Sequence, residues 1–160
     1  MDTNIKKILL GHPTKLPGYT TLDFVGSPDR NFDLNEPLDY EYNSLDEIAA
    51  YHVIEHLRPG RVKFLVESWV NCLKPGGKII IETPDFDGLI AWYIKEPDNR
   101  KALQWIFGDD SRKGQNHFWG YNKDRLLSLF EDLPVDAEFA EPQDYHAEEG
   151  PCLRIEVTKL

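Results

Sequence analysis

In the stretch Leu73-Lys74-Pro75-Gly76-Gly77-Lys78-Ile79-Ile80-Ile81, a tight turn leads directly into an apolar run. Proline at the second place of a turn and glycine at the third are typical of a type II turn, whose third residue takes a positive φ. The isoleucines predict a strand over residues 78–83. Because strands of a parallel sheet are covered on both faces and read as continuous apolar runs, this run indicates such a strand.

A helix is expected immediately before this turn. Apolar residues recur at helical spacing from Val62 to Leu73, and Pro59 suits a first helical turn. Further upstream, short segments with the composition of strands cover residues 8–10, 20–24, 31–34 and 46–51. Strands that alternate with helices predict an open, mostly parallel sheet, which binds ligands at the carboxyl ends of its strands.

The C-terminal region predicts an antiparallel pair of strands. Apolar and polar residues alternate from Leu153 to Thr158, which is typical of a half-buried strand, and residues 137–140 supply a partner. Before this pair, Asn122 has the character of an N-cap, and apolar residues follow at helical spacing up to Leu133. The chain is therefore expected to end in a helix and two antiparallel strands.

The composition is that of a single globular domain, residues 1–160, with 41% hydrophobic and 29% charged residues. The net charge of −10 argues against nucleic acid and anionic membranes, since both bind basic surfaces. No apolar run approaches the roughly 18 residues of a spanning helix or has the form of a signal peptide. Cys72 and Cys152 are expected to be free thiols. These features predict a cytoplasmic protein.

Residues 43–57 and 73–85 are similar to one block of the class I S-adenosylmethionine-dependent methyltransferase superfamily. The matching segments are Asn43-Ser44-Leu45-Asp46-Glu47-Ile48, Tyr51-His52-Val53-Ile54-Glu55-His56-Leu57, the turn quoted above and Pro84-Asp85. In that family, a Glu-His-Leu segment, a helix and a Leu-Lys-Pro-Gly-Gly turn join the fourth strand to the fifth. The resemblance implies a Rossmann-like α/β methyltransferase fold, mostly parallel with an antiparallel C-terminal strand, and S-adenosylmethionine as the cofactor.

The same resemblance implies which residues hold the cofactor. Gly11 corresponds to the glycine loop after the first strand, and Asp23 to the acidic end of the second strand, which holds the ribose hydroxyls. Asp33 and Leu34 resemble the position that contacts the adenine, and Tyr51 ends the fourth strand. A carboxylate can accept two hydroxyl hydrogen bonds, so the chemistry of this assignment is sound.

The N-terminal half departs from the family pattern. Gly11 is followed by His12 and Pro13, and proline lacks an N–H, so the loop differs from the usual one. Ten residues separate Leu10 from Thr21, whereas a parallel crossover needs about a dozen or more. We therefore expect a compact methyltransferase-like subgroup with a shortened N-terminal half that lacks some crossover helices.

The segment after the fourth strand carries the candidate catalytic residues. A neutral His52 imidazole could take the proton of an acceptor hydroxyl, and Glu55 or His56 could orient it or the substrate. Alternatively, Glu55 and His56 only brace the short helix. The three residues also match the His-x-x-Glu-His pattern of one zinc-protease class. The methyltransferase block accounts for the same residues, so we expect no metal site.

Residues 84–121 are expected to form an insertion on the acceptor side of the domain. Within it, His117 and Trp119 could line an acceptor pocket, or they could belong to a small aromatic core. No Asn-Pro-Pro-Tyr-type segment follows the fourth strand, which argues against methylation of an exocyclic amino group of a base. The sequence therefore predicts methyl transfer to a small-molecule or sugar-like acceptor, at oxygen rather than nitrogen.

Two other functions remain open at this point. The altered loop and the lost helices also fit a catalytically inactive methyltransferase-like module that binds or scaffolds a partner. A nucleotide-binding protein of different chemistry could use the same sheet, because fold alone does not fix function. Missing helices would leave sheet surface uncovered, and a homodimer is one way of covering it.

Overall fold

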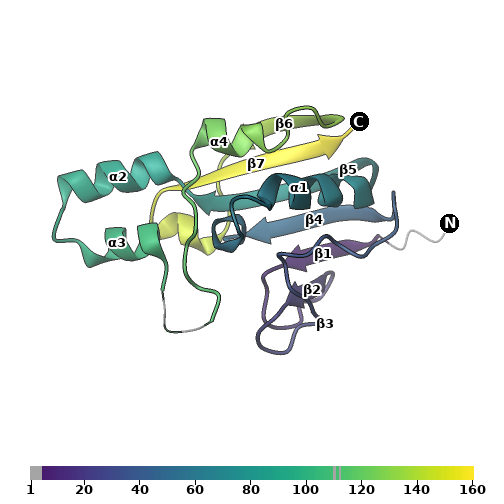
Figure 1. The fold of residues 1–160 in the computed structure, drawn as a ribbon, viewed down its shortest axis with the longest axis horizontal. Coiled ribbons are helices and arrows are strands. Elements are labelled where there is room, and N and C mark those ends of the chain that lie inside the picture. The colour runs from purple at the N-terminus through teal and green to yellow at the C-terminus, as the bar shows by residue number, and fades with distance from the viewer. Residues whose placement is uncertain (1–4, 110, 112) are drawn as a thin grey trace.

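A single seven-stranded sheet forms the framework of the chain in the computed structural model, which describes residues 5–109, 111 and 113–160 (Figure 1). The strands stand in the order β3-β2-β1-β4-β5-β7-β6. Their bounds are β1 Lys7–Leu10, β2 Thr20–Asp23, β3 Arg30–Asn31, β4 Leu45–Tyr51, β5 Leu73–Pro84, β6 Val135–Ala140 and β7 Cys152–Lys159. Only β7 pairs antiparallel with its neighbours, which confirms the predicted mostly parallel sheet with an antiparallel C-terminal strand.

The helices are concentrated in the C-terminal two thirds of the chain. Their bounds are η1 Ile54–His56, α1 Val62–Cys72, α2 Phe86–Lys95, α3 Arg100–Phe107, α4 Lys123–Ser128 and η2 Tyr145–Glu148. In the described residues, the connections from β1 to β2, β2 to β3 and β3 to β4 contain no helix, so the predicted loss of N-terminal crossover helices is confirmed. None of the described helices is long and apolar enough to cross a membrane.

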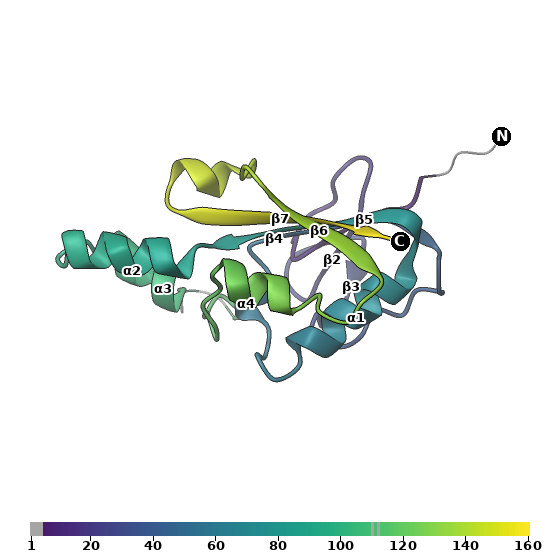
Figure 2. The ribbon, with the colours of Figure 1, turned by 90° about the horizontal axis from the view of Figure 1, so that it is seen from above.

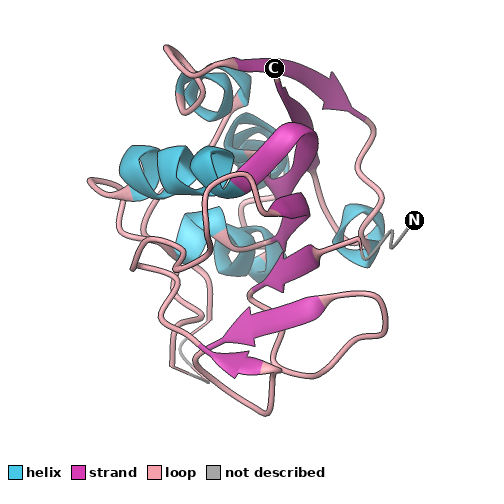
Figure 3. Cartoon of the chain, turned by 90° about the vertical axis from the view of Figure 1, so that its right-hand side faces the viewer, coloured by secondary structure: helices cyan, strands magenta, loops and turns pink. Residues whose placement is uncertain are grey.

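One face of the sheet carries the core. Helices α1 and α4 lie on this face, whereas α2 and α3 extend beyond the ends of the strands (Figures 2 and 3). Ile8, Ile48 and Ile79 are cross-strand neighbours on β1, β4 and β5, and each is at most 1% exposed. Trp69 of α1 is 1% exposed within the same cluster. Burial of this amphipathic helix face against the sheet is what stabilises the trimmed domain.

The opposite face of the sheet is largely polar. Its side chains include Glu47, paired with Lys7 at 2.9 Å, and the hydroxyl of Tyr19 also donates to Glu47. Ile80 projects on this side and is only half-buried, so the predicted burial of β5 on both faces is wrong. The physical reason is the absence of the crossover helices, because ion pairs and hydrogen bonds here replace apolar cover.

Several predicted boundaries shift. The third strand is confined to β3, and Asp33 lies beyond it in a turn where its Oδ1 accepts the N–H of Asn35 at 2.9 Å. Strand β5 begins at Leu73 and absorbs the predicted turn as a register irregularity against β4. The expected positive φ at Gly76 is confirmed at 77°. Local sequence therefore located the turn correctly, but its pairing with β4 extends the strand.

The start of helix α4 and the state of the two cysteines agree with the predictions from sequence. Asn122 caps α4, since its side chain accepts the N–H of Arg125 at 3.0 Å, which confirms the predicted N-cap. The helix stops at Ser128, earlier than predicted, and the chain continues in turns up to β6. Cys72 and Cys152 are both free thiols, as expected.

Substitution of Gly11 by alanine is expected to destabilise the fold more than the same change at Gly18. Both glycines have positive φ, 70° and 85°, so alanine strains the backbone at either site. Only at Gly11 would the new Cβ also meet Val53, whose Cγ2 would lie 2.5 Å away, whereas nothing lies within 4 Å at Gly18. In urea unfolding we expect an additional loss of about 1–3 kcal/mol for Gly11→Ala. Equal losses would show that Val53 can move away from the new Cβ at little cost.

Candidate functional site

The candidate site lies at the carboxyl ends of the parallel strands (Figure 1). Gly11 follows β1, Asp23 ends β2, and His52 directly follows Tyr51 at the end of β4. These positions agree with the sequence analysis. Asp33 is the exception, because β3 ends two residues before it. Open parallel sheets bind ligands at this edge, so the strand topology alone brings these residues to one place.

The N-terminal part of the site is held by its own backbone. Gly11 donates its N–H to the carbonyl of Leu22 at 2.8 Å. Asp23 is 6% exposed, and its Oδ1 accepts the N–H of Val25 at 3.1 Å. Leu34, 8% exposed, packs into the hydrophobic core. Asp23 is therefore a positioned carboxylate at a strand end, while Leu34 is chiefly a core residue.

Tyr51 lies on the polar face of the sheet, opposite the core. Its register partner is Glu82 of β5, which in turn pairs with Arg154 of β7. Burial raises the pKa of the Tyr51 phenol, and the charge of Arg154 opposes that rise. Tyr51 thus stays protonated near neutral pH and can donate a hydrogen bond from this face.

His52 is the most constrained residue of the site. Its φ is +54°, in the left-handed region that a non-glycine residue seldom occupies, and its N–H donates to the carbonyl of Glu82 at 2.8 Å. The side chain is 11% exposed. Its ring centroid lies 4.1 Å from that of His146 and 5.8 Å from that of Trp105. The imidazole is therefore held in one orientation by its neighbours.

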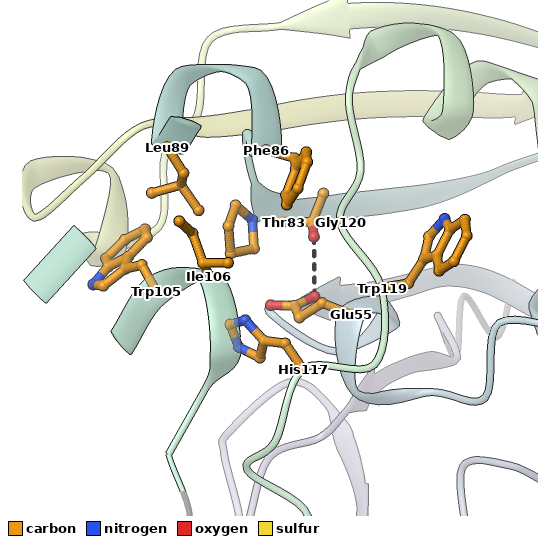
Figure 4. Close-up of a pocket in the computed structure, with 10 residues that line it drawn as sticks. Glu55, Thr83, Phe86, Leu89, Trp105, Ile106, His117, Trp119 and Gly120 are labelled. Carbon is orange, nitrogen blue, oxygen red and sulfur yellow. Dashed lines mark hydrogen bonds between the residues drawn. The ribbon is translucent and has the colours of Figure 1, made fainter. Parts of the chain in front are cut away.

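Glu55 lies beneath His52 and is 1% exposed. Its Oε2 accepts the hydroxyl of Thr83 at 3.0 Å, whereas its Oε1 has no hydrogen-bond partner (Figure 4). His52 Nδ1 lies 3.3 Å from Oε1 without hydrogen-bond geometry, so the attraction between them is electrostatic. Burial alone would raise the pKa of Glu55, but His52, with His56 and His117, lowers it to about 2. The carboxyl is ionised at neutral pH.

His56 and His117 lie on the other side of Glu55. Their ring centroids are 4.7 Å apart, and His56 Nδ1 lies 3.1 Å from the carbonyl oxygen of Asn116. Since a carbonyl only accepts, Nδ1 carries the proton in this contact. Burial lowers the pKa of His117, which favours its neutral form. A buried, ionised carboxylate therefore lies beside two imidazoles, of which His117 is held toward its neutral form by burial.

Side-chain atoms able to bind a metal converge in two groups. The ligand atoms of Glu55, His56 and His117 all lie within 4.8 Å of one another. The same is true of His52, Asp144 and His146. In the second group the two polar members bond each other, because His146 Nδ1 contacts Asp144 Oδ1.

Two cavities open beside these residues. A small one of about 10 Å³, room for roughly one water molecule, is bordered by Glu55, Thr83 and His117 (Figure 4). A larger one of about 520 Å³ lies between the start of α1 and α4 and includes Tyr121 and Arg125. The indole of Trp119 borders both cavities. Neither cavity borders Gly11, Asp23, Asp33, Leu34 or Tyr51.

Several solved structures that match this chain are S-adenosylmethionine-dependent methyltransferases. One from Methanosarcina mazei has a TM-score of 0.65 at 15% identity, over 98% of this chain and 93% of its own. One from Archaeoglobus fulgidus has a TM-score of 0.61 at 18% identity, over 98% and 87%. This chain has the fold of the S-adenosylmethionine-dependent methyltransferases. The resemblance inferred from residues 43–85 is thereby confirmed for the fold.

A third match is a methyltransferase with its ligands bound. The 1,6-didemethyltoxoflavin-N1-methyltransferase of Burkholderia thailandensis was solved with 1,6-didemethyltoxoflavin and S-adenosylhomocysteine. It has a TM-score of 0.56 at 14% identity, over 97% of this chain and 71% of its own. No protein-family model and no curated protein matches the sequence.

The fold brings the predicted catalytic and substrate residues together, but it does not place the predicted cofactor residues at the same cavities, and it adds others. His52, Glu55, His56 and His117 form one cluster, with Trp119 at its border. The sequence analysis missed the remaining contacts of this cluster, which come from Thr83, Trp105, Asp144, His146 and Cys152. Each is far from His52 and Glu55 in the chain and stands in no recognisable motif. The one available signal was the scarcity of histidine, since the chain has only five.

Proposed function

We propose that this chain transfers a methyl group from S-adenosylmethionine to a hydroxyl of a small-molecule or sugar-like acceptor. The observation that carries the proposal is His52, an enclosed imidazole at the end of β4 beside the ionised Glu55, in a methyltransferase fold. A base at this edge of the sheet stands where such folds bind their ligands.

The residues at the strand ends fit the cofactor. Asp23 would hold the ribose hydroxyls, since a carboxylate accepts two hydrogen bonds, and Gly11 lets the backbone approach closely because it has no Cβ. Asp33, Leu34 and Tyr51 would complete the cofactor site. When bound, the cofactor supplies the methyl group, whose bond to sulfur breaks as the acceptor oxygen bonds to its carbon.

His52 would take the proton that the acceptor hydroxyl loses. The negative charge of Glu55 beside Nδ1 favours a proton on that nitrogen, which leaves Nε2 as the base. Cys152 Sγ lies 3.8 Å from Nε2, and burial, with the nearby Glu82 carboxylate, raises the pKa of the thiol to about 12. Cys152 therefore stays protonated and does not compete as a nucleophile. Most of the acceleration would come from alignment of the reactants.

The insertion at residues 84–121 would shape the acceptor side. It contributes α2, α3 and the loop that carries His117 and Trp119. Arg125 stands 5.8 Å from the centroid of the Trp119 ring and reaches the larger cavity, so an aromatic face and a cation are available to an acceptor. The Burkholderia neighbour binds a small molecule, which supports this substrate class. That enzyme methylates N1, so the choice of oxygen here rests on the base and on the missing amino-methylation segment.

Cofactor binding is tested by calorimetric titration with S-adenosylmethionine and S-adenosylhomocysteine. We expect micromolar binding to the wild type and a loss of at least about tenfold in Asp23→Ala. Asp23→Asn keeps an acceptor for the Val25 N–H while removing the charge, so it separates cofactor contact from loop structure. Asp136→Ala, an exposed position on β6, is the matched control and should bind normally.

The alternative function is a catalytically inactive module that binds or scaffolds a partner. Pro13 in the shortened loop favours it, because the loop lacks the N–H groups of the usual glycine pattern. An absence of binding up to millimolar cofactor would replace the first proposal by this one.

Three further expectations stay predictions. They are that the protein forms a homodimer, that it has no nucleic-acid or membrane partner, and that it lies in the cytoplasm. Sedimentation at micromolar protein tests the dimer.

A further inference from the structure

Four of the five histidines of the chain converge on the region around Glu55. Of these, His56 follows Glu55 in η1, and His117 arrives from the loop after α3. The backbone fixes this meeting, since Phe118 donates its N–H to the carbonyl of Glu55 at 2.8 Å. The backbone N–H of His117 donates in turn to the carbonyl of Phe107 at 3.0 Å. The cluster is therefore built by tertiary structure and not by flexible surface side chains.

The His56 imidazole is oriented as a metal ligand is. A ligating histidine usually donates its other ring N–H to a carbonyl or carboxylate, which fixes its tautomer. His56 does this through Nδ1 and the carbonyl of Asn116, 3.1 Å away. One ring nitrogen of His56 is thus engaged by the backbone, and Nε2 is left to bind an ion.

Glu55 supplies a buried oxygen that lacks a hydrogen-bond partner. Leaving a buried carboxylate oxygen without a hydrogen bond is costly, and such groups in native structures call for an explanation. Oε2 is satisfied by Thr83, whereas Oε1 is not, and a cavity with room for about one water molecule borders the same carboxylate. Figure 4 shows Glu55 and His117 side by side at this cavity.

We propose that Glu55, His56 and His117 bind a divalent transition-metal ion. Two imidazoles and one carboxylate are a ligand set of catalytic zinc and of non-haem iron, with positions left open for water or substrate. Ligands of a tetrahedral ion with bonds of about 2.0–2.1 Å stand about 3.3 Å apart. The three ligand atoms lie within 4.8 Å of one another, so side-chain rotations suffice to close the site. This proposal departs from the expectation from sequence that no metal binds.

The second group of histidines fits an ion less well. His146 and Asp144 already bond each other through Nδ1 and Oδ1. The ring centroids of His52 and His146 are 4.1 Å apart with the rings tilted by 37°, a close ring contact that leaves little room for an ion between them. All three members are half-buried, and none has an orphaned buried atom. This group therefore serves as the negative control for the first.

The site binds metal whether or not methyl transfer occurs. If the proposed function holds, an open position on the ion would receive the acceptor hydroxyl and lower its pKa, next to His52 as the base. This second statement rests on the proposed function.

Metal binding is tested on the purified chain, stripped with a chelator and titrated with Co²⁺ while its visible absorption is recorded. We expect one Co²⁺ per chain, d–d bands of a site with nitrogen ligands, and displacement by Zn²⁺. His56→Ala and His117→Ala should each weaken binding at least about tenfold. Glu55→Gln should do the same, and circular dichroism verifies that each variant is folded.

His146→Ala is the matched control, since it removes one histidine of the other group. It should leave the Co²⁺ spectrum and stoichiometry unchanged. Loss of binding in His146→Ala with retention in His117→Ala, or no stoichiometric binding to the folded wild type, would overturn the proposal. S-adenosylhomocysteine binding by His117→Ala distinguishes the two proposals, because it should persist when the metal site is lost.

Discussion

Replacing Glu82 by alanine is expected to lower the free energy of unfolding by about 3–5 kcal/mol. Glu82 is fully buried on the polar face of the sheet. Its carboxylate accepts from Arg154 Nη1 and from the N–H of Gln143, both at 2.7 Å, and from the N–H of Asp144 at 2.9 Å. Without it, a guanidinium with 6% exposure and two backbone donors lose their partner. Urea unfolding measures the loss.

The matched control is Glu156→Ala. Glu156 also pairs with Arg154, at 2.7 Å from Nη2, but its side chain is 27% exposed, so its removal should cost no more than about 1 kcal/mol. In Glu82→Met combined with Arg154→Met, both charges vanish, and much of the stability should return. Similar losses of unfolding free energy in Glu82→Ala and Glu156→Ala would show that the buried Glu82–Arg154 pair contributes no more to stability than the more exposed Glu156–Arg154 pair.

Glu82 also connects the sheet to the site. By holding residues 143 and 144 it fixes the start of η2, which places His146 against the ring of His52. Its own carbonyl accepts the N–H of His52, the residue with positive φ. The buried carboxylate therefore has a structural result beyond stability, since it orders the His146 contact of the proposed base.

The mostly parallel sheet and its antiparallel ending could be predicted because they follow from local patterns. The error over β5 arose where two local inferences conflicted. The apolar run at 79–81 favoured cover on both faces, yet the short connections left no room for the helices that would provide it. Lys78, Ile80 and Glu82 share one face of β5, and those two charges were the signal that polar contacts, and not helices, cover this face.

The site was predictable only as far as its residues are neighbours in sequence. His52, Glu55 and His56 stand in one motif, and their strand-end location followed from the fold. The bond from Thr83 to Glu55 joins residues 28 apart, and the contact from His146 to His52 depends on a connection that carries no motif. Such contacts are set by how β5, β7 and the loop after α3 pack, which a pattern of residue types does not encode.

Removing the imidazole of His52 is expected to lower turnover by about 10²–10⁴-fold while cofactor affinity changes little. The loss follows if Nε2 takes the acceptor proton. Because φ at this position is +54°, His52→Ala also strains the backbone, whereas asparagine tolerates the left-handed region. His52→Asn therefore removes the base with less disturbance, and both variants should lose turnover equally.

Turnover is measured as release of S-adenosylhomocysteine. The acceptors are compounds with a single hydroxyl and compounds with two neighbouring hydroxyls. In His52→Asn the loss should fall on kcat, while KM for the acceptor changes little, because a base acts in the chemical step and not in binding. A structural role alone would raise KM as well. An unchanged kcat would remove His52 from the proton transfer and leave alignment of the reactants as the source of catalysis.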